Sequence, residues 1–595
     1  MNMYINDKDE LFKKALYFHS IKNLLEAEKL YQFLLDQGYR NSSLFINYGA
    51  LCKQNNQFKK SLDIYTKGIR LYPDNSKIYY NLANLHKLLD DNKKAIYYFK
   101  KSIEFNPNNL SYRSNLGTTL LSLGEFEEAE SQLRICIKEE PDNPIYNLNL
   151  GTVLKGLDRL TEAEFYAKKS LKIKPDLIEG YNNLATISIK KGELIKAKIL
   201  LIKSLELNHS SLAIYTNLCQ VLLDLQDFKL ALIYIDKAIE IKNDHAIFHF
   251  LKGNILHENN SIKEAIESFQ KALEIDQKLI KARWNLSLAQ LLTNDFSNGW
   301  LNYESRLEME EFNIHAQPKV PIWKGESLDK DSKLIVISEQ GLGDTIHFMR
   351  YIPYLRSQGI NISFCAQKVL HELIIVSDIH PHPILKEDTN LIKSGKYIPL
   401  LSLPKFLNIN NFNPLVTTPY ISTKSELVDK WKKIIRNDNK KIIGISWQGN
   451  PNTEKGILKG RSIPLEKFSR FKKFENLKLV SVQKGFGMEQ FKNCSFKNKF
   501  ADCQNIINQN CDFLDTAAIL INCDLVITSD SCVAHLAAAL GKPTWVLLKR
   551  SASWRFGLHE STFWYPSMRL FHQKELNNWD ELITRIIFEI EASEL

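Results

Sequence analysis

The chain has 595 residues, of which 44% are hydrophobic, 11% aromatic and 25% charged, and its formal net charge is +10. This composition is close to that of an ordinary globular protein, so a disordered, collagen-like or disulfide-stapled chain is excluded. No stretch approaches the roughly 18 consecutive apolar residues of a membrane-spanning helix, and the polar opening MNMYINDKDE is unlike a secretory signal. We therefore expect a cytoplasmic protein with no transmembrane segment.

Two further binding classes are disfavoured by the spacing of the residues. The nine cysteines form no CxxC pair and no histidine cluster accompanies them, so neither a metal site nor a cofactor is expected. The basic pairs fall among acidic residues on predicted helices, which indicates solvated helix faces rather than a nucleic-acid-binding stripe.

A period of 34 residues runs through the N-terminal half of the chain. Small residues recur at that period, and a proline closes four of the units. The small residues are Ala15, Gly49, Ala83, Gly117, Gly151, Ala185, Cys219, Gly253 and Ser287, and the prolines are Pro73, Pro107, Pro141 and Pro175. Glycine or alanine lets two helices cross closely, and proline fits where one helical hairpin stops and the next begins.

These positions resemble the tetratricopeptide repeat, whose hairpins stack into an α-solenoid because one hairpin cannot bury its apolar face alone. The resemblance implies nine repeats over residues 8–313, followed by a linker over 314–330. The last unit departs from the pattern with Gly299, Trp300 and Arg306, and its large side chains predict a helix that docks onto another domain.

An asparagine stands two positions before most of the small residues. These asparagines are Asn47, Asn81, Asn115, Asn149, Asn183, Asn217 and Asn285. A ladder of amides matches the donors and acceptors of an extended peptide backbone. It is similar to the asparagine ladder of the animal protein O-GlcNAc transferases, which implies a protein or peptide bound in the solenoid groove. Alternatively, the amides bond within the array, and the sequence leaves both interpretations open.

After about residue 330, short apolar strands alternate with glycine-containing turns and helices. The predicted strands are 334–338, 362–366, 442–447, 478–485, 525–528 and 544–548, the last of these being the final one, and helices are predicted over 345–357 and 533–540. This alternation predicts parallel, doubly wound sheets, whose ligands bind at the carboxyl ends of the strands. Two groups of strands, divided near 425–440, predict two facing lobes. Turns that place free N–H groups at a helix N-terminus favour an anion such as a diphosphate.

Two of these turns carry a family resemblance. The segment from Gln340 to His347 (QGLGDTIH) and the segment from Asp530 to Pro543 (DSCVAHLAAALGKP) are similar to bacterial heptosyltransferases, which are two-lobed glycosyltransferases of the GT-B fold. The chain resembles still more closely the bacterial proteins that fuse tetratricopeptide repeats to such a domain, and Trp554-Arg555 also fits that group. The resemblance implies a short first lobe at 331–430 and a nucleotide-sugar-binding second lobe at 431–595.

The resemblance also implies roles for individual residues. Asp344 would take the proton of the acceptor hydroxyl, as a carboxylate within hydrogen-bond reach can do; the alternative is that Asp344 caps its helix. Asp530 and Ser531 would bind the sugar and the phosphates, and His535 would donate a proton or hydrogen bond to the leaving diphosphate. The alternative for His535 is a histidine packed beneath the sheet.

Other residues at the turns are predicted to complete the nucleotide-sugar site. They are Gly341, Gly343, Gln448, Gly449, Arg461, Gln483 and Lys484. Gly341 and Gly343 would let the donor approach the backbone. Arg461 would neutralise the leaving diphosphate without a metal, or would simply be a surface charge.

The sequence thus predicts an inverting glycosyltransferase that acts by a single displacement. It would transfer a sugar from a nucleotide sugar to a polypeptide or glycan acceptor recruited by the repeats. The alternative is a non-catalytic scaffold for protein–protein interaction with a degenerate glycosyltransferase domain, which the short first lobe favours. The joint presence of Asp344, Asp530 and His535 favours the enzyme.

Overall fold

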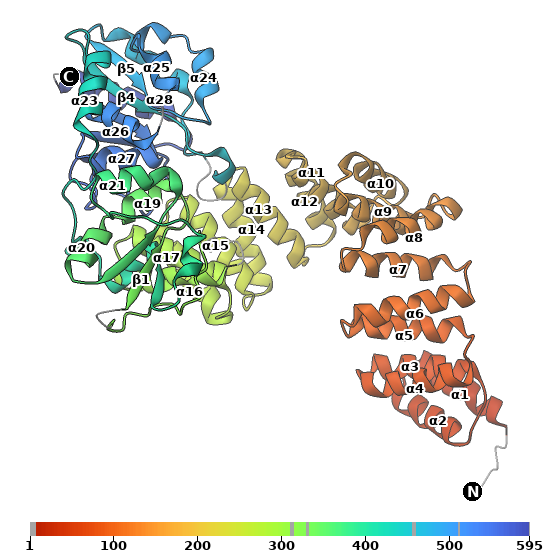
Figure 1. Ribbon diagram of the computed structural model, residues 1–595. Coiled ribbons are helices and arrows are strands. Elements are labelled where there is room, and N and C mark those ends of the chain that lie inside the picture. The colour runs from red at the N-terminus through yellow and green to blue at the C-terminus, as the bar shows by residue number, and fades with distance from the viewer. Residues whose placement is uncertain are drawn as a thin grey trace. The chain divides into compact units, whose positions relative to one another are not determined.

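The computed structural model describes residues 7–309, 314–328, 332–454, 460–509, 512–551 and 553–593 (Figure 1). Residues 310–313, at the end of the predicted repeats, and 329–331, where the predicted linker meets the first lobe, lie outside the described residues. The chain forms two compact units, Met1–Gln226 and Asp227–Leu595. The predicted order is confirmed: a helical solenoid comes first and an α/β region with parallel sheets follows.

The first unit consists of helices that follow one another at the predicted period. They are α1 (Lys8–Ser20), α2 (Leu24–Asp36), α3 (Ser42–Gln54), α4 (Phe58–Leu71), α5 (Ser76–Leu88), α6 (Asn92–Phe105), α7 (Leu110–Ser122), α8 (Phe126–Glu139), α9 (Pro144–Gly156), α10 (Leu160–Ile173), α11 (Ile178–Lys190), α12 (Leu194–Leu207) and α13 (Leu212–Asp224).

Short polar residues set where many of these helices begin and end. The side chains of Asn75, Asn109 and Asn143 accept hydrogen bonds from backbone N–H groups in the first turns of α5, α7 and α9. These bonds satisfy donors that a helix leaves unpaired at its N-terminus. After α5 and α7 the chain turns through Asp90 and Gly124 with φ of 60° and 79°. This left-handed conformation is a common helix stop, and it lets the next helix fold back on the previous one.

The recurring small residues permit close helix crossing, as the sequence predicted. A Cβ atom placed on Gly49 would lie 2.3 Å from the ring of Tyr65, and one on Gly253 would lie 2.5 Å from the ring of Phe269. Both distances are far shorter than any tolerated carbon–carbon contact, so a larger residue would force the two helices of the hairpin apart.

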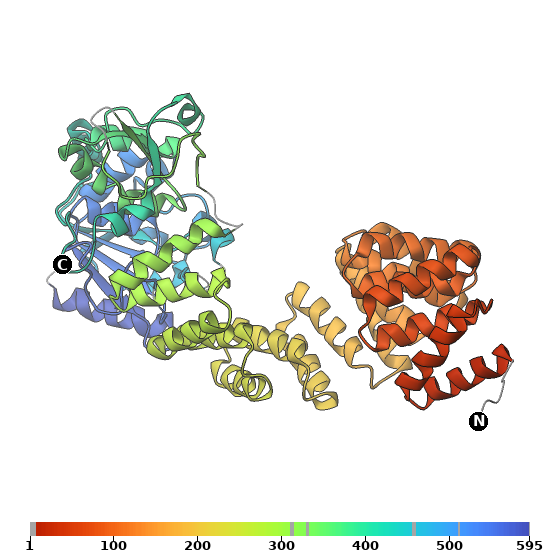
Figure 2. The same cartoon turned by 90° about the horizontal axis from the view of Figure 1, so that it is seen from below.

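The second unit begins with the remaining helices of the array. They are α14 (Phe228–Ile241), α15 (Ala246–Glu258), α16 (Ile262–Ile275), α17 (Ile280–Leu292) and α18 (Phe296–Tyr303), which is followed by the 3-10 helix η1 (Glu304–Glu308). Residues of α15 to α18 share one apolar core with both lobes of the α/β region. Figure 2 shows the ribbons of the last repeats, in yellow-green, beside those of the α/β region. Trp300 donates its indole N–H to the carbonyl of Ile409 at 2.7 Å and packs edge-on against Trp554. The docking predicted for the last repeat is therefore confirmed.

A buried ion pair strengthens this joint between α18 and the first lobe. The Arg306 guanidinium donates to both carboxylate oxygens of Glu339 at 3.0 and 2.9 Å, and the two side chains are 1% and 0% exposed. Arg306 also donates to Glu304 at 2.7 Å and to the hydroxyl of Ser402 at 2.7 Å. Glu339 in turn accepts from the backbone N–H of Leu401. Each charge is thus matched by several hydrogen bonds, which a buried pair requires.

The first lobe contains a three-stranded parallel sheet of order β2-β1-β3. Its strands are β1 (Lys333–Ile337), β2 (Asn361–Cys365) and β3 (Lys396–Pro399), and its helices are α19 (Leu342–Phe348), α20 (Tyr351–Ser357), α21 (His371–Val376) and α22 (Leu403–Phe406). The helix predicted over 345–357 is therefore two helices, α19 and α20. Strand β3 was not predicted because it is short: it consists of the four residues KYIP, which pair with β1.

The second lobe contains a five-stranded parallel sheet of order β5-β4-β6-β7-β8. Its strands are β4 (Lys441–Ser446), β5 (Leu477–Ser481), β6 (Leu525–Ser529), β7 (Thr544–Leu548) and β8 (Met568–His572). Its helices are α23 (Ser425–Ile435), α24 (Met488–Lys492), α25 (Gln504–Gln509), α26 (Phe513–Ile521), α27 (Cys532–Ala539) and α28 (Trp579–Ala592), together with the 3-10 helix η7 (Leu465–Lys473). The prediction that 544–548 is the last strand is wrong, since β8 follows and pairs with β7.

Candidate functional site

Two helix N-termini, one from each lobe, meet where the central strands β1 and β6 end. Helix α19 begins just after the glycine turn that follows β1, and α27 begins at Ser531 just after β6. Gly343 makes this approach possible, because a Cβ atom at that position would lie 3.2 Å from the Cα of Cys532 and 3.3 Å from the His535 ring. The structure thus gives Gly343 a role in helix packing, whereas the sequence analysis assigned it to the donor.

Asp344 makes two kinds of contact in this joint. One carboxylate oxygen accepts from the backbone N–H of Gly341 at 3.1 Å, which is the helix-capping role. The other forms an ion pair with Arg555, with nitrogen–oxygen distances of 2.5 and 2.6 Å. The side chains of Asp344 and Arg555 are 15% and 16% exposed. The capping alternative is therefore present in the structure, and the carboxylate also reaches the second lobe and remains partly open to solvent.

Asp530 is the second carboxylate of this cluster, at the carboxyl end of β6. Burial raises the pKa of Asp530 above its ordinary value; the charges of Arg461 and Arg555 oppose that change, and the charge of Asp344 reinforces it. The charge of Lys549 also acts on this carboxylate. The charges of Asp344, Arg461, Arg555 and Lys549 thus act on Asp530, which lies at the carboxyl end of β6, where ligands of parallel sheets bind.

Ser531 lies at the N-cap of α27, and its hydroxyl is 3.0 Å from that of Thr528. Its side chain is partly exposed and makes no capping hydrogen bond to the first N–H groups of α27. Arg461 covers Gly449, since a Cβ atom on that glycine would lie 2.9 Å from the guanidinium. Arg461 is also 3.7 Å from Glu454. The structure thus brings Gly449 and Arg461 to the same sheet edge as Asp530 and Ser531.

His535 lies behind this cluster rather than at its surface. Its ring is 3% exposed, and its Nδ1 is 3.2 Å from Nδ1 of His347 and 3.3 Å from the hydroxyl of Tyr565. Burial, with the charges of Arg555 and Arg350, lowers the pKa of His535 to about 3. The imidazole is therefore neutral near pH 7, and its surroundings favour the packed-histidine alternative over a proton donor.

Gln483 and Lys484 are directed toward the protein rather than toward an open surface. The buried side chain of Gln483 accepts from the backbone N–H groups of Trp447 and Gln448, both at 3.0 Å, and donates to the carbonyl of Gln448 at 2.8 Å. It ties the ends of β4 and β5 together. Lys484 donates to the carbonyl of Ile507, and Gln448 accepts from Gln490 at 2.8 Å. These residues support the strand ends on which Gly449 and Arg461 are held.

Arg555 and Lys549 are the residues of this cluster that sequence reasoning did not assign to the site. Lys549 directly follows β7 at the ligand-binding edge of a parallel sheet, and this position was the signal that could have identified it. The sequence indicated Arg555 only as part of a family motif. Its contacts, with Asp344 and with the side chain of Gln340 at 3.0 Å, join distant parts of the chain, so no local pattern indicates them.

The asparagine ladder donates hydrogen bonds within the array. Asn115 donates to Tyr80, Asn149 to Ser114 at 3.1 Å, Asn217 to Asn182 at 3.0 Å and Asn285 to Asn254 at 2.7 Å, in each case a residue of the preceding repeat. Asn47 donates to the carbonyl of Ser43 and Asn81 interacts with Tyr65, but the buried amide of Asn183 has no hydrogen-bond partner among the described residues. These bonds favour the interpretation that the amides join neighbouring repeats, and they engage donors that a bound peptide would need.

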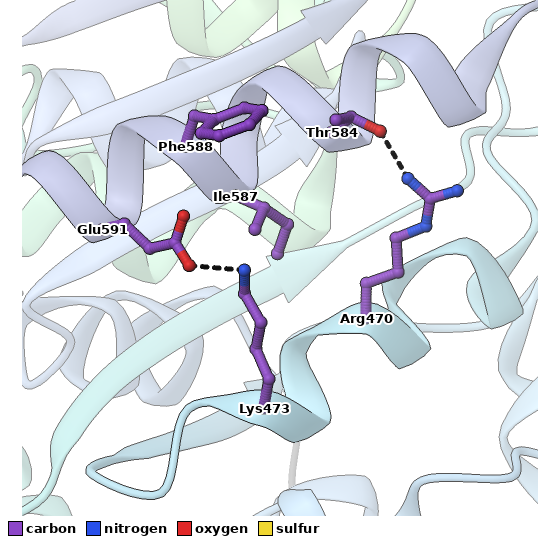
Figure 3. A pocket seen from close by; sticks show the side chains of 6 residues that line it. All are labelled: Arg470, Lys473, Thr584, Ile587, Phe588 and Glu591. Carbon is purple, nitrogen blue, oxygen red and sulfur yellow. Dashed lines mark hydrogen bonds and ion pairs between the residues drawn. The ribbon is translucent and has the colours of Figure 1, made fainter.

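A hollow of about 340 Å³ lies on the second lobe between η7 and α28 (Figure 3). The two basic side chains at its rim have partners on α28: Lys473 lies 2.5 Å from Glu591, and Arg470 donates to the hydroxyl of Thr584. None of the predicted site residues lines this hollow. Over the described ranges, no helix is both long and apolar enough to cross a membrane.

Family models match both parts of the chain. Tetratricopeptide repeat models match residues 76–109, 98–131, 146–177 and 212–245, and a TPR repeat model matches 253–293. The model for glycosyltransferase family 9 (heptosyltransferase) matches residues 494–561, which include β6, α27, β7, Lys549 and Arg555. The chain therefore combines tetratricopeptide repeats with a C-terminal domain of the glycosyltransferase family 9 type.

Individual relatives are distant. Protein FlbA of Caulobacter vibrioides is 24% identical over 317 residues, which are 48% of this chain and 51% of FlbA, so the match spans about half the length of that relative. A tetratricopeptide repeat protein from Parabacteroides merdae is 17% identical with a TM-score of 0.33, and the match covers 48% of this chain and 98% of that one. The APC/C hetero-tetramer Cut9-Hcn1 is 16% identical with a TM-score of 0.36, and the match covers 49% and 57% of the two chains.

Proposed function

We propose that this chain is a cytoplasmic, metal-independent glycosyltransferase of the GT-B type. It takes a sugar from a nucleotide-sugar donor held at the N-terminus of α27 and transfers it to a polypeptide or glycan acceptor recruited by the repeats. The observation that carries the proposal is the convergence of Asp344 from the first lobe with Asp530 and Arg555 from the second. The match of residues 494–561 to glycosyltransferase family 9 supports the same reaction class.

The donor diphosphate is assigned to the N-terminus of α27 and to the cations around it. Helix α27 offers its first N–H groups and the positive end of its dipole, which favour phosphate oxygens. Arg461 and Arg555 supply the guanidinium groups that neutralise a leaving diphosphate. Asp530, with its raised pKa, lies among these cations and would accept hydrogen bonds from the sugar hydroxyls.

The transfer is proposed as one displacement with inversion. The acceptor hydroxyl oxygen attacks the anomeric carbon, the bond from that carbon to the diphosphate oxygen breaks, and the hydroxyl proton passes to Asp344. Arg555 holds Asp344 in the absence of donor. When the diphosphate binds, the guanidinium turns toward it, and the carboxylate is left to act as a base. His535, neutral and buried, ties α27 to the last turn of α19 through His347 and transfers no proton.

A second candidate function is a scaffold that binds proteins without catalysis. The observation that favours it is the tight packing of α19 on α27 together with the ion pair that occupies Asp344. In a scaffold this pair would be a permanent part of the joint, and Arg555 would have no ligand to move toward.

The two candidates are separated by a screen of the full chain against a panel of nucleotide sugars. A donor at a hundredfold excess over its Kd stabilises the native state by about 2.7 kcal/mol, which a thermal-shift measurement detects. The transferase predicts stabilisation by one class of nucleotide sugar, followed by slow release of its nucleoside diphosphate. The absence of any shift across the panel would leave the scaffold.

A further inference from the structure

The segment that follows β7 lies beside the proposed donor site. Parallel pairing sets Ser529, the last residue of β6, opposite Leu547, and β7 ends one residue later at Leu548. Lys549 therefore leaves the sheet at the same edge as Ser531, the N-cap of α27. Its charge acts on Asp530, as noted above.

The side chain of Lys549 is held by a repeat, not by the sheet. Its ammonium lies 3.1 Å from a carboxylate oxygen of Glu258, the last residue of α15, and these side chains are 13% and 14% exposed. The same oxygen accepts from the hydroxyl of Ser551 at 3.0 Å, and Arg550 donates to the carbonyl of Asn259 at 3.4 Å. Three consecutive residues after β7 are thus bound to the C-terminal end of one repeat helix.

Glu258 is ionised over the physiological pH range. Burial opposes its ionisation, but the neighbouring His257 side chain, 3.6 Å away, and the charge of Lys549 outweigh burial and lower the pKa of Glu258 to about 2. A lysine side chain is flexible and strongly hydrated, so a fixed position next to a ligand needs a partner that orients it. Glu258 is that partner.

We propose that Glu258 is a positioning residue of the donor site: it fixes Lys549 and the segment 549–551 beside Ser531, so that a repeat of the solenoid forms part of the site. This inference rests on the proposed function, because it assigns Lys549 to the diphosphate of the donor. It makes the repeat that ends at Glu258 a component of the transferase, and the solenoid is then more than a separate module for recruiting acceptors.

The test measures the donor KM and kcat of the full chain for Glu258→Ala, Lys549→Ala and the double variant. Glu258→Ala is expected to raise the donor KM at least about fivefold with kcat changed less than about twofold, because it disorders a binding group without touching the base. Lys549→Ala is expected to raise KM similarly. The double variant is expected to match Lys549→Ala alone, since the proposal makes Lys549 the group through which Glu258 affects the donor.

A matched control comes from the same part of the array. Asp236 of α14 lies 2.8 Å from Lys252 of α15, and these side chains are 52% and 32% exposed. Asp236→Ala also removes an acidic partner of a lysine and is expected to leave the donor KM unchanged. Thermal unfolding of each variant shows whether the second unit remains folded.

Three results would overturn the inference. The first is an unchanged donor KM in Glu258→Ala. The second is a lower donor KM in that variant, which would mean that Glu258 withholds Lys549 from the donor. The third is a Glu258→Ala effect of equal size with and without Lys549, which would mean that the carboxylate only stabilises the fold. Failure of the proposed function is distinguishable, because the unaltered chain would then bind and turn over no nucleotide sugar.

Discussion

The second unit contains two arginine–carboxylate clusters that differ in completeness. Arg306 and Glu339 are sealed between the last repeat and the first lobe; Arg306 also donates to Ser402 and Glu304, and Glu339 also accepts from the N–H of Leu401. Arg555 and Asp344 are partly exposed, and the second carboxylate Asp530 lies close to them. A sealed and saturated pair holds a fold together, whereas an open cluster with an uneven balance of charges is suited to receive a ligand.

The largest expected effect breaks the sealed pair. Arg306→Ala leaves Glu339 charged and buried without its partner, so we expect a loss of about 3–5 kcal/mol in the free energy of unfolding. Urea denaturation followed by tryptophan fluorescence measures it, because Trp300 and Trp554 pack together in this joint. A loss below about 1 kcal/mol would show that the joint does not depend on this pair.

The next effect is on the chemistry of the open cluster. Asp344→Asn keeps the size of the side chain and removes its ability to accept a proton. We expect kcat to fall about 100-fold or more, because a general base contributes that much to a rate. Donor binding, followed by calorimetry, is expected to stay within about threefold of the unaltered chain. Unchanged turnover would assign Asp344 to helix capping alone.

A substitution of Arg555 tests whether this arginine binds a ligand, in contrast to Arg306, which holds the fold together. Arg555→Met is expected to raise the Kd for a nucleoside diphosphate about tenfold, because one charge-assisted contact to the phosphates is lost. Arg569→Met is the control: Arg569 is also paired with a carboxylate, Glu589, but it lies on β8 with a side chain that is 39% exposed. Equal affinities for the Arg555 variant and the unaltered chain would place the diphosphate elsewhere.

The smallest expected effect is on stability and concerns Asp530 of the open cluster. Its substitution should stabilise the chain, whereas substitution of Arg306 in the sealed pair should destabilise it. Because the pKa of Asp530 is raised in the folded state, its ionisation at neutral pH costs stability, and that cost fades as the pH falls through the raised pKa. Asp530→Asn is therefore expected to stabilise the chain at pH 7. Thermal unfolding at several pH values measures this gain, which should shrink toward acidic pH. A variant that is less stable at pH 7 would contradict this account.

The sequence predicted the repeats and the strands other than β3 and β8 because their signals are local. The 34-residue period and the apolar, β-branched runs that precede glycine turns need no knowledge of the fold. Strand β8 was missed, because MRLFH includes the charged Arg569 on its partly exposed face. Asp344 and Asp530 were assigned to the site through the resemblance of their turns to those of heptosyltransferases. Gly343 was assigned to the donor because sequence does not show that α27 lies against it.

Contacts between distant segments could not be predicted. The partners Arg555 and Asp344 are 211 residues apart, and Lys549 and Glu258 are 291 residues apart. Their pairing depends on how the last repeats dock on the lobes, through Trp300 and Arg306. The sequence predicted that docking but not its geometry.

The most direct test of the account locates the bound diphosphate. Hydrogen exchange of the full chain would be followed peptide by peptide, with and without uridine, guanosine, adenosine and cytidine diphosphates. The account predicts that one of them slows exchange at 530–536, where α27 begins, and near Arg555. If each nucleotide left those segments unchanged, or protected only another part of the chain, the donor site proposed between Asp344 and Asp530 would be contradicted.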